Sequence, residues 1–420
     1  MTPLSPGRRT GVFVAAFLAW LFAGLEIALF VLIHRQMALE LLGTDTPEAV
    51  VARWFAWFQA AFLFGAAAGG WLFGALGDRV GRSRALAASV LCYSLGALAC
   101  YACRSAELML ALRFVACMGI GGAWPNAVAL VSEVWPGGSR PLIAGLLGAA
   151  ANVGFVLLGA VAYLHPVTQE SWRWALLVGA TPAALGVVIL LAVAESPRWL
   201  EARKAPAAGA PVAEVLRPPL LARTIAGVLL GAIPVVGSAA NANWVVPWSD
   251  AVERAAGAGP KPPPDPRAKA WTLVVRSTGG IFGSLLGGLL AGAVGRRPSY
   301  FLISLGALAA SSYLFTQLDP LHPQFHTAVF VLGFVGITYF GWLPLYLPEL
   351  FPTRVRATGA GVSFNTGRVV AGVVVLSAGL LLDRFGGDYA QVGFWTGTIY
   401  AAGLLVIWLV PRDAAGRVKD

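Results

Sequence analysis

The sequence predicts an all-α integral membrane protein, and three observations carry that prediction. Hydrophobic residues make up 58% of the chain and charged residues only 12%, with a mean hydropathy of +0.73. Soluble domains carry about 25% charged residues. Apolar windows of about 19 residues recur along the chain, long enough to cross a hydrocarbon core of about 30 Å as helices. No window shows the alternating pattern of a strand, so we expect no sheet.

Twelve such windows define twelve expected transmembrane helices. They cover residues 12–34, 54–77, 84–103, 106–131, 141–163, 173–194, 224–248, 271–293, 299–317, 325–347, 357–382 and 389–410. The fifty glycines suit this interpretation, because small residues let membrane helices approach closely. The first window is too long for the apolar region of a signal peptide and lacks a clear cleavage site, so we expect it to be retained.

The net charge of +10 is explained by topology. Lysine and arginine concentrate in the loops on the side that would hold both termini, whereas acidic residues lean to the other side. This asymmetry is typical of cytoplasmic loops. We therefore expect both termini in the cytoplasm, a multi-pass protein of the cell membrane in contact with lipid, and no nucleic-acid partner.

The chain contains an internal repeat. The segment "EVWPGGSRPLIAG" at 133–145 is echoed by "ELFPTRVRATGAG" at 349–361, and Gly81–Arg82 is echoed by Gly295–Arg296. Each copy precedes or follows an expected span at the same position within a unit of six, and six spans per unit make the two units parallel repeats. We expect a first six-helix bundle over 1–194, a cytoplasmic linker over 195–223 and a second six-helix bundle over 224–420, with a Pro-rich outer loop over 249–270.

Three motifs resemble signatures of the major facilitator superfamily (MFS). They are "GALGDRVGR" at 74–82, "RFVACMGIGGAWPNAVALVSEVWP" at 113–136 and "ESPRWL" at 195–200. The last two are similar to the sugar-porter and organic-anion or metabolite:H⁺ symporter branches. The resemblance covers nearly the whole chain. It implies the MFS fold and a secondary transporter that works by alternating access, with a substrate site between the halves and with neither enzymatic activity nor a cofactor.

The sequence departs from the family pattern in two places. Gly292 and Ala293 stand in the second repeat where the first has an aspartate and an arginine. The first span reads "FAGLEIAL", with Glu26 as its only acidic residue, whereas aromatic-acid and sialate symporters typically carry two aspartates there.

The charged residues of the repeated motifs are predicted to form gates. Ion pairs among them would hold the two halves together on the cytoplasmic side while the outer side is open, because breaking a partly buried pair is costly. The alternative is that they only set topology and cap helices. The expected gating residues are Asp78, Arg79, Arg82, Glu133, Arg140, Glu195, Arg198, Arg296, Glu349 and Arg356.

Apart from residues at the first two positions of a span, four charged residues fall within the spans, where each costs about 2.5–3.5 kcal/mol to insert and is therefore a functional candidate. Glu26 is the predicted proton-coupling group, the alternative being a permanent structural pair with Arg113. Arg113, Arg276 and Arg368 are predicted substrate-binding residues, since a guanidinium holds a carboxylate through two hydrogen bonds. For Arg276 the alternative is that its side chain reaches out to the outer surface.

Neutral polar residues in the spans complete the expected site. Asn241, Asn243 and Asn365 are predicted to hydrogen-bond the substrate or, alternatively, a neighbouring helix. His322 and His326 have helical metal-ligand spacing, but they lie in a proline-containing outer loop without further ligands, so no metal site is expected.

These residues predict a small organic anion as substrate, an aromatic or sugar-derived carboxylate moved together with H⁺ by a monomeric carrier. Two other hypotheses stay open. The first is a carrier of neutral sugars or polyols, which the "ESPRWL" motif allows equally well. The second is a non-transporting membrane sensor on the same fold, for which the missing charges at Gly292 and Ala293 would be a sign.

Overall fold

The computed structural model describes residues 4–135, 140–202, 211–257, 265, 267–352 and 355–410. Within these residues there is no strand, and twelve helical segments are long and apolar enough to cross a membrane. The chain is thus an all-α multi-pass membrane protein, as its sequence predicts.

The first six spans form what we call the first half. They are α1 (Pro6–Leu42), α2 (Glu48–Val80), α3 (Arg82–Ala102), α4 (Ala106–Val134), α5 (Arg140–Leu164), and α6 (Trp174–Ala180) with α7 (Ala183–Ala192), which together make one span. Two short helices follow, α8 (Pro197–Ala202) and α9 (Pro211–Val215).

The last six spans form the second half. They are the run α10 (Leu220–Val236), η2 (Gly237–Asn241), η3 (Ala242–Trp244) and α11 (Val245–Gly257); then α12 (Ala268–Ala293), α13 (Arg296–Gln317), α14 (Phe325–Glu349) and α15 (Arg356–Arg384); and α16 (Tyr389–Gly397) with α17 (Ile399–Leu409) as one span.

Several helices are longer than predicted. The first continues to Leu42, and the seventh span begins at Leu220 and runs on through α11 into the expected outer loop. Helical hydrogen bonding continues past the apolar window, so hydropathy alone underestimates the ends. This difference moves several charged residues from predicted loops into helices.

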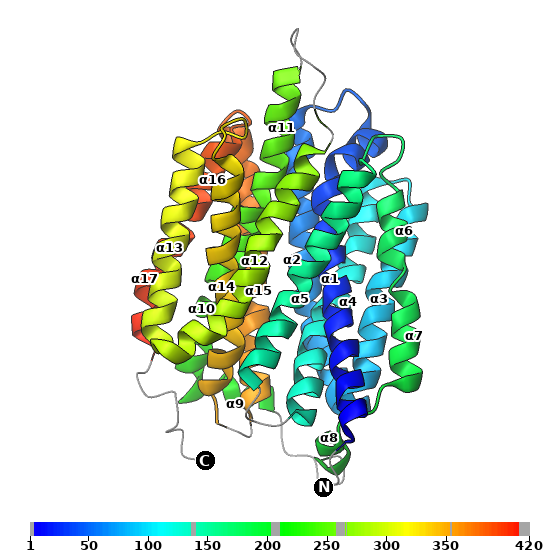
Figure 1. The fold of residues 1–420 in the computed structure, drawn as a ribbon, viewed down its shortest axis with the longest axis vertical. Helices are drawn as coiled ribbons and strands as arrows, with labels where there is room; N and C mark the ends of the chain where they lie inside the picture. Colours follow the sequence, from blue (N-terminus) through cyan, green and yellow to red (C-terminus); the bar gives the residue numbers. More distant parts are fainter. Residues whose placement is uncertain are drawn as a thin grey trace.

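Helix α1 begins and helix α17 ends toward the same end of the molecule, the lower end in Figure 1. We call this end the terminal side and the opposite end the far side. The first half lies on the right of the view and the second half on the left. The halves pack together most extensively through two helix pairs, α2 with α15 and α5 with α12.

Glycines bring α12 and α14 into backbone contact. Gly279, Gly283 and Gly287 recur every four residues, so they lie on one face of α12. A Cβ atom at any of them would overlap the backbone of α14, at Phe330, Phe334 and Thr338 respectively. Small residues permit this close approach in membrane helices.

A proline interrupts the seventh span. Pro234 has no N–H to donate to the carbonyl of Leu230, and its ring crowds that carbonyl. The hydroxyl of Tyr300 instead donates to the Leu230 oxygen at 2.9 Å. The chain then passes through a π-helical turn and a 3₁₀ turn before α11. Such interruptions often occur at functional sites.

The repeated Gly-Arg pairs have the same backbone role in both halves. Gly81 and Gly295 precede the first residues of α3 and α13 with φ values of +116° and +88°. Side-chain-bearing residues rarely adopt such angles, so glycine is required at both turns.

Candidate functional site

Glu26 and Arg113 form a buried ion pair inside the first half. Glu26 is on α1 and Arg113 on α4, and both side chains are almost completely buried. One guanidinium nitrogen lies 3.9 Å from a carboxylate oxygen and donates to the backbone oxygen of Glu26 at 3.1 Å. The guanidinium also lies over the Phe30 ring, 4.1 Å from its centroid.

This pair is incompletely satisfied. Oε1 of Glu26, and Nε and Nη2 of Arg113, are buried without a hydrogen-bond partner. Burying polar atoms without partners is unfavourable, so the geometry leaves both groups with capacity for another ligand.

Arg276 lies where the two halves meet. It projects from α12, is 5% exposed, and its guanidinium carbon lies 5.3 Å from the ring centroid of Phe155 on α5. It therefore does not reach out to the surface. Its Nε has no hydrogen-bond partner, and no carboxylate of the described residues lies within ion-pair distance.

Arg368 and Asn365 instead join the halves directly. Both are on α15, and Arg368 donates to the Asn365 side-chain oxygen at 3.2 Å and to the backbone oxygen of Ala66 on α2 at 3.3 Å. A Cβ at Gly70 of α2 would meet the Asn365 amide. These contacts use one guanidinium nitrogen of Arg368 and the side-chain oxygen of Asn365 to join α2 and α15.

The two asparagines of the interrupted seventh span differ in their bonding. Asn241 donates to Ser311 at 3.0 Å and to the backbone of Gly393 at 2.6 Å, so it ties η2 to α13 and α16. Asn243 is buried with an unpaired side-chain oxygen, and the neighbouring Trp244 has an unpaired ring nitrogen. Only the second asparagine has free hydrogen-bonding capacity.

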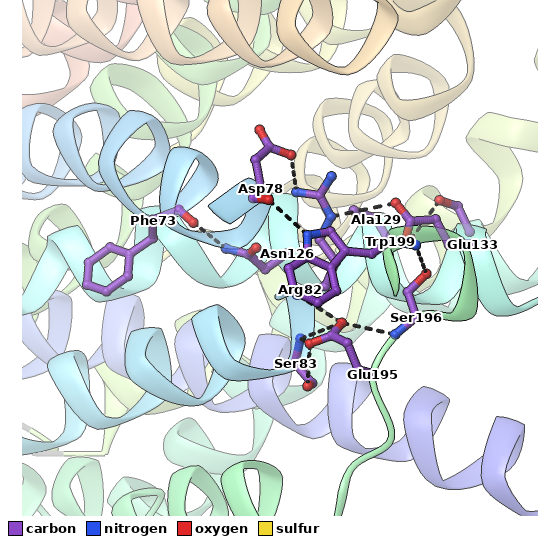
Figure 2. Close-up of polar contacts among 11 residues, drawn as sticks. Phe73, Asp78, Arg82, Ser83, Asn126, Ala129, Glu133, Glu195, Ser196 and Trp199 are labelled. Carbon is purple, nitrogen blue, oxygen red and sulfur yellow. Dashed lines mark hydrogen bonds and ion pairs between the residues drawn. The ribbon is translucent and has the colours of Figure 1, made fainter. Parts of the chain in front are cut away.

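On the terminal side of the first half, a cluster of charges surrounds Arg82 (Figure 2). Arg82 pairs with Asp78 at 2.6 Å and with Glu133 at 3.6 Å, which links the start of α3 to the ends of α2 and α4. Arg79, by contrast, is exposed and forms no ion pair with another described residue.

Glu195 caps the N-terminus of α3. Its carboxylate accepts hydrogen bonds from the backbone N–H of Arg82 at 2.9 Å and from the N–H and hydroxyl of Ser83 at 3.2 and 2.8 Å (Figure 2). A helix N-terminus attracts a negative group. Trp199 of α8 donates to the backbone oxygen of Asp78 at 2.9 Å, so the start of the linker is held against the first half.

The second half carries a corresponding pair. Arg296, at the start of α13, binds both oxygens of Glu349 on α14, at 2.7 and 3.1 Å. The side chains of Arg140, Arg198 and Arg356 lie outside the described part of the structure.

The terminal-side charges are expected to pair between the halves when the outer side is open. In this structure Asp78, Arg82 and Glu133 pair within the first half, and Arg296 and Glu349 within the second, so pairing between the halves in the other state stays a prediction. In this conformation the described ion pairs of the terminal side therefore hold each half together rather than joining the two.

On the far side, ion pairs do cross between the halves. Arg254 of α11 donates to both oxygens of Glu48 at the start of α2, at 3.3 and 3.2 Å. Glu48 also accepts from Arg35 of α1, and Arg254 also pairs with Asp250. Phe55 of α2 packs edge-on against Trp244 of the second half beneath this chain of charges.

Comparison with known proteins identifies the family. The profile of the family described as sugar (and other) transporter matches residues 11–218. A probable 4-methylmuconolactone transporter of Cupriavidus pinatubonensis is 30% identical over 84% of this chain and 81% of its own. The chain belongs to the major facilitator superfamily.

Other similarities agree with this membership. The cis,cis-muconate transport protein of Acinetobacter baylyi is 26% identical over 95% of this MFS transporter and 92% of its own chain. The xylose transporter XylE from E. coli, in a partially occluded inward open conformation, has the same fold, with a TM-score of 0.74 and 17% identity over 96% of this chain and 97% of that one. The protein is thus a transporter and not an enzyme.

The far-side residues of this MFS transporter escaped the sequence analysis. Glu48 and Arg254 were assigned to outer loops, because the second expected span began too late and the seventh ended too early. A signal was present: Asp250 and Arg254 are four positions apart, the spacing of an ion pair along a helix. That spacing indicates that the helix continues past residue 248.

Proposed function

We propose that this transporter moves a small organic anion together with H⁺, by alternating access between its two halves. The observation that carries the proposal is Arg276, a cation buried between the halves without a carboxylate partner among the described residues. A buried charge is costly unless it is paired. A carboxylate substrate would supply the missing partner through a two-point hydrogen bond, and the Phe155 ring beside it suits an apolar or unsaturated carbon skeleton.

The proposed site spans both halves. Arg276 comes from the second half, and Arg113 of the first half has two free guanidinium nitrogens. Asn243 and Trp244 add unpaired polar atoms from the seventh span. We assign smaller roles to Arg368, Asn365 and Asn241, because each already forms at least one side-chain hydrogen bond within the protein.

Proton coupling is assigned to Glu26. When Glu26 is ionised it neutralises Arg113, and when it takes up a proton it frees Arg113 to bind an anion. Because both groups are buried and in contact, the site favours taking up the proton and the anion together. A permanent structural pair would instead have its remaining polar atoms satisfied by the protein.

The structure corresponds to a state closed on the far side, where Glu48 and Arg254 join the halves. With both termini in the cytoplasm, as the distribution of positive charge predicts, the closed side is the outer one. The terminal-side pairs around Arg82 and Arg296 would then support gating indirectly, because they keep each half rigid while the two halves move relative to each other.

The names of two relatives support an organic acid as substrate, since they specify muconate and 4-methylmuconolactone. A neutral sugar is the second candidate. It is favoured by the likeness to XylE in fold and by the free polar atoms of Asn243 and Trp244, which suit hydroxyl groups.

Reconstitution into liposomes tests the proposal. Uptake of radiolabelled cis,cis-muconate, benzoate and xylose is measured with and without an inward proton gradient. We expect the gradient to drive accumulation of a carboxylate. Glu26→Gln should abolish accumulation but retain exchange, whereas the exposed-loop control Glu170→Gln should behave like the wild type.

The arginine is tested in the same assay. Arg276→Gln should raise the KM for the carboxylate about tenfold or more, because a charge-assisted interaction of about 1.5–3 kcal/mol is lost. The matched control is Arg104→Gln, an exposed arginine in the α3–α4 connection. Transport of xylose alone, insensitive to the proton gradient and to Arg276→Gln, would exclude the anion and leave the sugar carrier.

A further inference from the structure

Helix α12 presents two buried cations on one face. Lys269 and Arg276 are seven positions apart, so they lie on the same side of the helix, about 10 Å from each other along its axis. Thr272 lies between them on that face and is fully buried. The two cations therefore form a row that leads from the far side toward the site between the halves.

Neither cation is satisfied by the protein. Lys269 is 3% exposed, and its Nζ has no hydrogen-bond partner. The Nε of Arg276 is likewise buried without a hydrogen-bond partner. A buried ammonium strongly requires an acceptor or a counter-charge, so Lys269 as well as Arg276 retains the capacity to bind an anion.

The groups that face Lys269 explain why no internal anion serves it. Asp250 attracts the Lys269 ammonium but is not within ion-pair distance of it, whereas Arg254 and Arg35 repel it. Asp250 is bound by Arg254, and Glu48 by Arg35 and Arg254.

The cluster has three basic side chains, Lys269, Arg254 and Arg35, against two carboxylates, Asp250 and Glu48. His34 of α1, whose Nδ1 lies 3.0 Å from the backbone oxygen of Val31, and Tyr389 of α16 also face it. The cluster thus has an excess of positive charge on the side from which an external substrate would approach.

We propose that Lys269 is the primary cation of a second carboxylate-binding site, which holds the organic anion at the far side before the anion passes along α12 to Arg276. In the state open to the far side, Arg254 leaves Glu48, and the Lys269 ammonium faces the route between the halves. The transfer between the two sites covers about two helical turns. This inference rests on the proposed function, because its ligand is the same organic anion.

The opposing explanation is that Lys269 is structural and is held by long-range attraction to Asp250. The two explanations predict opposite effects of replacing Lys269 on the stability of the protein. If Lys269 awaits a ligand, its replacement by an apolar residue removes an unfavourable buried charge. If Lys269 supports the fold, the same replacement destabilises it.

The experiment compares Lys269→Met, Lys269→Arg and the control Arg267→Met, which neutralises an exposed cation two positions away. Uptake of cis,cis-muconate and benzoate is measured in intact cells, which present the substrate to the outer side only. We expect the KM to rise about tenfold in Lys269→Met, with the maximal rate retained. Lys269→Arg and Arg267→Met should stay close to the wild type.

The purified proteins give the second measurement. We expect ligand-free Lys269→Met to melt at or above the wild-type temperature, and the increase in melting temperature caused by muconate to be smaller than in the wild type. A lower melting temperature with an unchanged KM would show that Lys269 is structural and overturn the proposal.

The failures can be told apart. If Arg276→Gln weakens carboxylate uptake and Lys269→Met does not, the second site is wrong and the proposed function stands. If the wild type neither binds nor transports any carboxylate tested, the proposed function fails and the second site fails with it.

Discussion

The cross-half pair of Glu48 and Arg254 should determine how strongly the transporter favours its far-side-closed state. Arg254→Gln removes the two hydrogen bonds to Glu48 that cross between the halves, of 3.2 and 3.3 Å. Charge-assisted hydrogen bonds contribute about 1.5–3 kcal/mol when buried. These side chains are 38% and 27% exposed, so screening by water reduces the contribution to about 1 kcal/mol. The expected result is an approximately fivefold shift in population toward the state open at the far side.

Distances between two spin labels, measured by pulsed electron paramagnetic resonance, can detect this shift. Spin labels are attached at Asp45→Cys, in the loop after α1, and at Gln317→Cys, at the end of α13, in a Cys92→Ser background. Both labelled positions are exposed on the far side and lie in different halves. In Arg254→Gln the longer-distance population should increase.

Two further variants decide whether the pair itself is responsible. Glu48→Gln should shift the population as Arg254→Gln does, and combining the two should add little, because they remove the same interaction. Arg267→Gln, an exposed far-side cation without an ion pair to a described residue, is the control. Fully additive shifts, or distances in Arg254→Gln identical to the wild type, would refute the reasoning.

Two predictions concern the packing that supports the site. Gly283→Ala should destabilise the protein by about 1–3 kcal/mol in a melting assay, because the added Cβ meets the α14 backbone. Gly292→Ala on the same helix is the control and should be neutral, because its Cβ meets nothing within 4 Å. Equal melting temperatures of the two variants would contradict the close packing. Tyr300→Phe should cost about 1–3 kcal/mol in the same assay, because the Leu230 carbonyl loses its donor. Adding Pro234→Ala, which restores an N–H for that carbonyl, should recover part of the loss, and no recovery would show that the tyrosine hydroxyl acts elsewhere.

The number and order of the spans could be predicted because each depends on a local property, the length of an apolar window. Their ends could not, because charged residues such as Glu48 and Arg254 sit in helices beyond the apolar stretch. The internal repeat could also be predicted from the sequence. Gly81 and Gly295 show its physical basis, because both adopt a positive φ.

Which charged residues pair with each other could not be predicted with certainty, because the pairing depends on tertiary structure. Pairing of Glu26 with Arg113 was an alternative in the sequence, since both lie within spans and carry opposite charge, and the structure places them together. The charges of the repeated motifs gave no indication of whether they pair across the halves or within them. That choice depends on the conformational state, which a repeated sequence does not encode. Lys269 was missed because it was assigned to the outer loop.

The glycine face of α12 has a consequence for anyone who wishes to change what this transporter carries. Gly279, Gly283 and Gly287 lock α12 onto α14, so the helix that bears Lys269 and Arg276 cannot tilt or shift to accommodate a bulkier cargo. Redesign of cargo preference should therefore leave the glycines intact. It should instead vary the facing surface of α5, where Phe155 could be trimmed to make room without disturbing the alignment of the cations.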